Sequence, residues 1–82
     1  MLYRGGQALK SAEYVRRYRA FLHRLRQARA DAGLTQNEVA RRLSRPQSFM
    51  SKCESGERRV DFVELQEIAK IYRKAISYFI SG

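Results

Sequence analysis

Four polar side chains between residues 47 and 52 carry the most informative chemistry in this chain. They are Gln47, Ser48, Ser51 and Lys52, and helical spacing would set them together on the outward side of one short helix. Amide and hydroxyl groups both donate and accept hydrogen bonds, as is needed to read base edges in the major groove of DNA. A merely solvated helix face would more often carry Glu and Lys. We call these four residues the polar edge and interpret it as a candidate base-reading surface.

Gln47 has the most specific chemistry of the four. Its amide can accept from N6 and donate to N7 of adenine, a bidentate pair that discriminates between bases by about 1 to 3 kcal/mol. The alternative is that Gln47 only caps its helix. Lys52 could take guanine or a phosphate. Phe49 falls between the core face and the outward face, so it either packs at the flank or touches a thymine methyl group.

The signals of two short helices surround the polar edge, within residues 35–56. Thr35 can cap the first helix, because its hydroxyl can accept from the backbone N–H of Glu38 while the Glu38 carboxylate reaches back to the Thr35 N–H. Leu34 and Val39 can close over this turn as a hydrophobic staple. These signals predict a helix of about nine residues.

The second helix is expected to follow after a turn of about three residues. Ser44 and Arg45 interrupt the apolar pattern, and Pro46, which fits the first turn of a helix, restarts it. Met50 and Cys53 share the face that would pack onto the first helix. Together the two helices would hold the polar edge away from the core.

Several short motifs fall at the spacings of a known family: Gly33-Leu34-Thr35-Gln36, Ala40, Pro46-Gln47-Ser48 and Glu54-Ser55-Gly56. On these motifs, residues 18–80 resemble the Xre/Cro family of phage-repressor-type helix-turn-helix domains. The resemblance implies an all-α fold, a compact five-helix bundle of the lambda-repressor-like DNA-binding kind, here with an extended first helix. It also implies that Arg29 and Glu54 form a structural ion pair. Ser44 stands where the family often has Gly, and Arg45 where it often has an apolar residue.

Five side chains are candidates for contacts with DNA phosphates. Gln36 and Asn37 stand at the N-terminus of the first motif helix, where free backbone N–H groups also favour an anion. Arg45 could aim its charge at a phosphate from the turn. Arg58 and Arg59 follow in a polar loop, where the resemblance implies backbone contacts and a solvated loop is the alternative interpretation.

A long first helix is predicted between Ser11, a good N-cap, and Gly33, a left-handed C-cap. Its apolar stripe recurs at spacings of three and four residues: Tyr14, Tyr18, Phe21, Leu25, Ala28 and Ala32. The helix is longer than a minimal domain of the resembled family needs. Its first turns, with Tyr14, Val15 and Tyr18, must therefore cover either the last helix or part of a second subunit.

Two more helices complete the predicted bundle. Asp61 and Glu64 can form a second capping box, and the helix that they open has apolar residues on more than one side, as a central helix would: Val63, Leu65, Ile68, Ala69, Ile71 and Tyr72. A last short turn covers residues 76–80. Part of it closes the core, and the remainder would be an apolar patch for dimerisation, formed by Tyr78, Phe79 and Ile80.

Composition limits the class of protein. The 82 residues suffice for one domain, which we divide into a flexible arm, residues 1–10, and a helix-turn-helix domain, residues 11–82. With 17 Lys and Arg against 8 Asp and Glu, the formal charge of +9 favours polyanionic partners. The single Cys excludes an internal disulfide, and no apolar run reaches the length of a membrane span. We therefore expect a cytoplasmic protein with no metal, no cofactor and no membrane partner.

These features favour sequence-specific binding of double-stranded DNA by a transcription regulator, a repressor that acts as a homodimer on a near-palindromic operator. No enzyme is indicated, because the single His has no partner in sequence and no phosphate-cradling glycine loop is present. One alternative is an antitoxin or anti-regulator that sequesters a protein partner, with DNA binding only autoregulatory. Another is nonspecific coating of nucleic acid, which the charge alone would permit.

Overall fold

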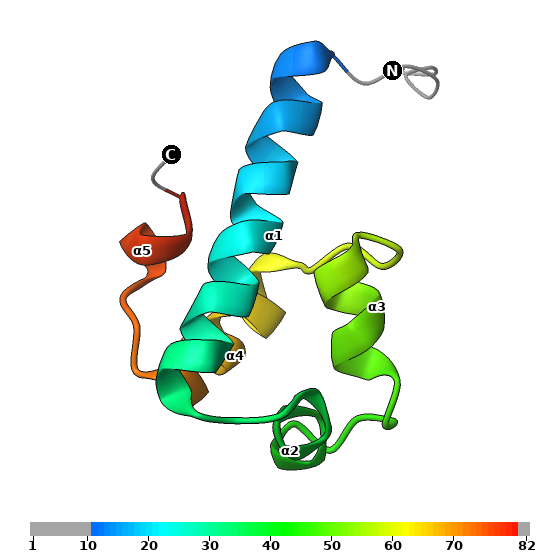
Figure 1. Cartoon of the computed structure of the whole chain (residues 1–82), viewed down its shortest axis with the longest axis vertical. Helices are drawn as coiled ribbons and strands as arrows, with labels where there is room; N and C mark the ends of the chain where they lie inside the picture. Colours follow the sequence, from blue (N-terminus) through cyan, green and yellow to red (C-terminus); the bar gives the residue numbers. More distant parts are fainter. Residues whose placement is uncertain (1–10, 81–82) are drawn as a thin grey trace.

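The computed structural model describes residues 11–80. Within this part of the chain there are five helices and no strand: α1 (Ala12–Ala32), α2 (Gln36–Arg42), α3 (Phe49–Ser55), α4 (Phe62–Tyr72) and α5 (Ile76–Ile80) (Figure 1). The predicted all-α bundle of five helices, with a long first helix, is thus confirmed. The expected arm at residues 1–10 lies outside the described residues.

Local caps define α1 as predicted. The Ser11 hydroxyl accepts a hydrogen bond of 2.9 Å from the Tyr14 backbone N–H, which satisfies one of the free donors at the helix start. Gly33 ends the helix in the left-handed region, with φ of 70°, and its N–H donates to the Ala30 carbonyl. A residue with a Cβ is disfavoured in this conformation, so Gly33 suits the C-terminus of α1.

Both predicted capping boxes are present. In α2, the Glu38 N–H donates to the Thr35 hydroxyl at 3.1 Å, and the Thr35 N–H donates to the Glu38 carboxylate at 2.8 Å. In α4, the Glu64 N–H donates to Asp61 at 2.7 Å, and the Asp61 N–H donates to Glu64 at 3.0 Å. Each box satisfies two backbone donors reciprocally, so the starts of both helices follow from residues three apart.

The connection between α2 and α3 differs from the prediction. The first motif helix is shorter than expected, and α3 begins at Phe49 rather than at Pro46. Ser44 adopts a left-handed φ of 58°, which ends α2 where the resembled family often places Gly. The Phe49 N–H then donates to the Pro46 carbonyl at 2.9 Å in a separate turn. Pro46 therefore opens a turn before the helix, and the connection runs over residues 43–48 instead of about three residues.

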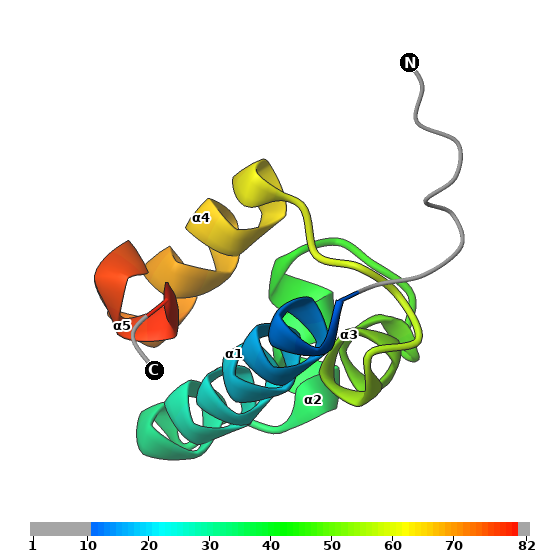
Figure 2. The same cartoon turned by 90° about the horizontal axis from the view of Figure 1, so that it is seen from above.

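The helix α1 is the axis of the bundle. It contacts α3, α4 and α5, and α2 packs mainly on α3. Figure 1 shows α3 and α5 on opposite sides of α1, and Figure 2 shows α2 and α3 together on one side with α4 and α5 on the other. All five helices contribute buried residues to one core: Leu25, Ala28, Val39, Ala40, Phe49, Met50, Cys53, Leu65, Ile68, Ala69, Tyr72 and Phe79.

The last two helices depart from the prediction at Val63 and Phe79. Phe62 and Val63, at the start of α4, are each 63% exposed, so the prediction that Val63 helps to make α4 apolar toward the bundle on more than one side was wrong. The reason is geometric, because Leu65, Ile68 and Tyr72 form the single face that meets the bundle. Phe79 in α5 is only 1% exposed and packs against Phe21 at 6.5 Å between ring centroids. It belongs to the core of the domain and is not available to a second subunit.

Candidate nucleic-acid interface

The polar edge lies at the surface. Gln47 and Ser48 occupy the turn that precedes α3, and Ser51 and Lys52 follow in its first turn. All four side chains are exposed. The Ser51 hydroxyl donates to the Ser48 carbonyl at 3.0 Å, while the Ser48 side chain makes no capping hydrogen bond to α3. Amide, hydroxyl and ammonium groups are therefore presented to solvent at one end of one short helix.

The starts of α2 and α3 converge on the same surface. Gln36 and Asn37 from α2 line one hollow of about 580 Å³ together with Gln47, Ser48 and Ser51. Three residues of the polar edge and two candidate phosphate ligands are thus brought together from two helices. Free backbone N–H groups at a helix start add positive potential to such a surface.

The opposite side of α3 faces the core. Met50 and Cys53 are fully buried, as their spacing predicted. Phe49 is buried as well, which resolves its ambiguous position in favour of packing and against contact with a thymine methyl group. Burial raises the pKa of the Cys53 thiol, so this side chain acts as a small apolar residue. On the other side of α3, Ser51, Lys52 and Ser55 are exposed and can meet a partner.

A first ion-pair cluster locks α3 to α1 and α2. Glu54, near the end of α3, is 3% exposed, and Arg29 of α1 contacts both of its carboxylate oxygens, at 2.7 and 3.0 Å. The Gln36 amide donates to the same carboxylate at 2.9 Å. These hydrogen bonds raise the pKa of Arg29. We call Arg29, Gln36 and Glu54 the Glu54 cluster; it contains the ion pair that the family resemblance implied.

The Glu54 cluster also orients Gln36. One N–H of the amide is held by Glu54, while the amide nitrogen carries a second N–H and the carbonyl oxygen remains an acceptor. Arg26 strengthens the same junction, because its guanidinium donates to the Glu54 backbone carbonyl at 2.8 Å. The start of α2 is therefore placed by the end of α3.

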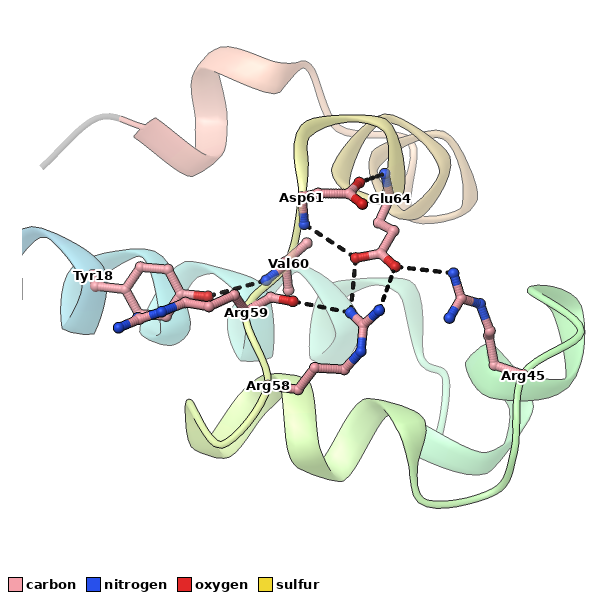
Figure 3. Close-up of polar contacts among 7 residues, drawn as sticks. All are labelled: Tyr18, Arg45, Arg58, Arg59, Val60, Asp61 and Glu64. Carbon is pink, nitrogen blue, oxygen red and sulfur yellow. Dashed lines mark hydrogen bonds and ion pairs between the residues drawn. The ribbon is translucent and has the colours of Figure 1, made fainter. Parts of the chain in front are cut away.

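A second cluster lies on the other side of α3 (Figure 3). Glu64 of α4 is 7% exposed and accepts two hydrogen bonds from Arg58, at 2.8 and 2.7 Å, and one from Arg45, at 2.9 Å. The Arg58 guanidinium, followed by the Asp61 N–H and the Arg45 charge, lowers the pKa of Glu64 to about 2. We call Arg45, Arg58 and Glu64 the Glu64 cluster. Sequence reasoning assigned Glu64 only to a helix cap and missed both arginine partners.

The arrangement of α2 and α3 agrees with a match to a known family. A family model described as a helix-turn-helix domain, of the Xre/Cro DNA-binding type, matches residues 20–74. The chain belongs to this family. No curated protein and no solved structure matches the chain significantly. In helix-turn-helix domains the second helix of the motif is the one that enters the major groove, and α3 occupies that position in this chain.

The long first helix of this helix-turn-helix domain covers the loop after α3. The Val60 N–H donates to the Tyr18 hydroxyl at 3.2 Å, and the Arg59 guanidinium lies 4.5 Å from the Tyr18 ring centroid (Figure 3). Arg59 also lies 5.3 Å from the ring of Tyr14. Tyr14 and Tyr18 in the first turns of α1 thus contact the loop after α3 of the same domain, which differs from both predicted partners, the last helix and a second subunit.

The two arginines of that loop do not form a pair. Arg58 points to Glu64, whereas Arg59 points to Tyr18 (Figure 3). A phosphate straddled by both side chains would require one of them to leave its partner. Arg45 also contacts Glu64, through Nη2 alone. Sequence reasoning predicted phosphate contacts for Arg45, Arg58 and Arg59, and it found no signal for the carboxylate that Arg45 and Arg58 share.

The candidate dimer residues lie in three different environments. Phe79 is in the core. Tyr78 is partly buried, with the Arg24 guanidinium at 5.3 Å and the Lys74 ammonium at 4.5 Å from its ring centroid. Ile80 is 71% exposed. Only the last of these offers a large apolar surface at the end of α5.

Two features are absent from the described part of the chain. No helix among residues 11–80 is both long and apolar enough to cross a lipid bilayer. In the same part of the chain, no three side chains of His, Cys, Asp or Glu gather where they could hold a metal ion.

Proposed function

We propose that this helix-turn-helix domain binds double-stranded DNA in a sequence-specific manner as a transcription regulator. The observation that carries the proposal is the exposed polar edge at the start of α3, backed by a fully buried opposite face. Placed in a major groove, Gln47, Ser48, Ser51 and Lys52 would meet base edges. Gln47 would read adenine through its amide.

Phosphate contacts would set the position of the domain on the duplex. Gln36 and Asn37 border the same hollow as the polar edge, so they would meet the DNA backbone beside the groove. Arg45, Arg58 and Arg59 would add charge from the two loops that flank α3. The formal charge of +9 supports this attraction to a polyanion.

We further propose a repressor that occludes a promoter as a homodimer. Two copies related by a two-fold axis would place two α3 helices about 34 Å apart on a near-palindromic operator. The exposed Ile80 supplies a large apolar side chain at the end of α5 for this association.

Selection of bound duplexes from a random library at fixed salt tests this proposal directly. The expected outcome is one enriched near-palindrome, whose half-site spacing reports the dimer. Enrichment of a single half-site would reject the dimer, and no enrichment over random DNA would reject sequence-specific binding in favour of nonspecific coating.

Within that assay, Gln47→Ala is expected to relax specificity at one base position, at a loss of about 1 to 3 kcal/mol for the cognate base. Asn37→Ala is the matched comparison, because it truncates an exposed side-chain amide that lines the same hollow. It should weaken binding to all sequences and leave the salt dependence unchanged, because the lost amide is neutral. Equal losses on selected and random duplexes for Gln47→Ala would count against base reading by this residue.

The second candidate function is an antitoxin or anti-regulator that sequesters a protein partner. The exposed Phe62 and Val63 at the start of α4 favour it, because neighbouring large apolar side chains are uncommon on a free surface. Copurification of a stoichiometric protein partner would support this function, whereas a homodimer with nanomolar operator affinity would support the first.

A further inference from the structure

We propose that Glu64 is a positioning residue for DNA recognition, which fixes the recognition helix α3 from outside and aims Arg45 at a DNA phosphate. This inference rests on the proposed function. It assigns to α4, a helix with no residue in the polar edge, a direct influence on specificity.

The first argument is the placement of the partners of Glu64. Arg45 lies in the connection before α3, and Arg58 lies in the loop after it. Both guanidinium groups bond to the same carboxylate oxygen, at 2.9 Å from Arg45 and 2.7 Å from Arg58 (Figure 3). One side chain of α4 thus ties both ends of α3. Displacement of either end would break a charge-assisted hydrogen bond in a largely buried place.

The second argument is the packing of Phe49, the first residue of α3. The guanidinium carbons of Arg45 and Arg58 lie over its ring, at 4.6 and 4.9 Å from the centroid. Because Glu64 holds both guanidinium groups, it also holds them against this ring. Rotation of α3 about its axis would move Phe49 away from the two cations, so the cluster opposes that rotation.

The third argument concerns charge. One carboxylate faces two guanidinium groups, so the Glu64 cluster keeps a net charge of about +1. Arg45 uses only Nη2 for Glu64, and 38% of its side chain is exposed. Its remaining N–H groups are suited to a phosphate oxygen, since a guanidinium presents five donors in a fixed plane. Glu64 would therefore set the direction of a phosphate contact that Arg45 makes.

When Glu64 loses its charge, a positioning role and simple electrostatics predict opposite changes in the affinity for the selected duplex. Glu64→Gln raises the formal charge of the protein by one, which strengthens attraction to any DNA. The same change loosens Arg45 and Arg58, which weakens contacts that need α3 in one orientation. Binding to random DNA should therefore stay equal or rise while binding to the selected duplex falls. General loss of structure would lower both.

The experiment measures Kd for a selected duplex and for a scrambled duplex of equal length, at one salt concentration, by fluorescence anisotropy. For Glu64→Gln we expect the ratio of the two affinities to fall about tenfold, the size of one lost base contact. The matched control is Glu57→Gln, which removes the same charge from an exposed loop position and should leave the ratio unchanged. An unchanged ratio in Glu64→Gln overturns the proposal, as does an equal fall in both affinities.

A second variant keeps the charge and changes only the reach. Glu64→Asp retains the carboxylate but is one methylene shorter, so it cannot keep both guanidinium groups in place. It should lower the affinity ratio with no change in binding to scrambled DNA, and a wild-type ratio would overturn the proposal. Circular dichroism at the assay temperature shows that each variant is folded. A wild-type protein that prefers no duplex would instead reject the proposed function itself.

Discussion

The two buried carboxylates beside α3 differ in what surrounds them. Glu54 belongs to α3 itself, and its ion-pair partner Arg29 is only 22% exposed. Glu64 belongs to α4, and its partners Arg45 and Arg58 are 38% and 37% exposed. The Glu54 cluster is therefore mainly interior, while the Glu64 cluster reaches from the core to the surface.

The two clusters also differ in net charge, in keeping with their different burial. Arg29 and Glu54 form a one-to-one pair, so nearly all of its charge is cancelled inside the bundle. Glu64 faces two arginines and leaves a positive excess near the surface. Buried pairs cost desolvation and are poor sources of net stability, although removal of one partner is costly. Removal of one partner should therefore cost more stability in the Glu54 cluster, whereas the Glu64 cluster also supplies positive charge near the surface and orients its arginines.

The largest expected effect is on the Glu54 cluster. Arg29→Ala leaves the Glu54 carboxylate buried with only the Gln36 amide as a side-chain donor. We expect a loss of about 3 kcal/mol in the free energy of unfolding, measured by urea denaturation. Arg19→Ala, an exposed position on the same helix, is the control and should change the free energy by less than about 0.5 kcal/mol. A small effect of Arg29→Ala would mean that the pair contributes no more than a surface salt bridge.

The next effect is the pH dependence of the stability that Glu64 contributes. The pKa of Glu64 is about 2 in the folded protein, against about 4.3 in an unfolded chain. Because the folded value is the lower one, its contribution is complete above about pH 5 and is lost as the pH falls toward 2. We expect Glu64 to contribute about 2 kcal/mol to the free energy of unfolding, after allowance for solvent screening at the partly exposed arginines.

The measurement is the free energy of unfolding of the wild-type protein and of Glu64→Gln between pH 6 and pH 2. The stability difference between the two proteins should shrink by the stated amount across this range, since Gln does not titrate. A difference that is constant with pH would show that Glu64 has an ordinary pKa, and that its arginines are held by something else.

Local signals in the sequence were sufficient for the starts of three helices. Ser11, Thr35 and Asp61 each bond to a backbone N–H three residues away, so each cap could be predicted from adjacent letters. The start of α3 could not be predicted from adjacent residues in this way. Pro46 is compatible both with a first helical turn and with a turn before a helix, and the left-handed conformation of Ser44 decides between them.

The candidate site shows the same limit. Helical spacing accounts for the exposure of Ser51 and Lys52, but Gln47 and Ser48 lie in the turn before α3. The two buried carboxylates do not follow from spacing at all. Arg45 and Glu64 are nineteen residues apart, and Arg29 and Glu54 are twenty-five apart, so no short-range pattern connects either pair. The second pair was expected only because a family resemblance implied it. The first depends on how α4 packs behind α3, which is a property of the tertiary fold.

The smallest effects come from two tyrosine hydroxyls, one beside each cluster. Tyr18 accepts from the Val60 N–H, next to the start of α4. Among the buried side-chain nitrogen and oxygen atoms that the structure describes, the Tyr72 hydroxyl is the one without a hydrogen-bond partner. Burial, followed by the nearby charge of Glu54, raises its pKa. Removal of the Tyr18 hydroxyl should therefore lower the free energy of unfolding, whereas removal of the Tyr72 hydroxyl should not.

Tyr18→Phe should lower the free energy of unfolding by about 1 kcal/mol, because it leaves a backbone N–H without its partner. Tyr72→Phe should be neutral or raise it by up to about 1 kcal/mol, because it removes a buried hydroxyl that has lost its hydrogen bonds to water. Thermal unfolding of both variants beside the wild type measures the two signs under one set of conditions. Destabilisation by Tyr72→Phe would mean that this hydroxyl supports the charges of Arg29 and Glu54, so that the Glu54 cluster extends to α4 just as the Glu64 cluster does.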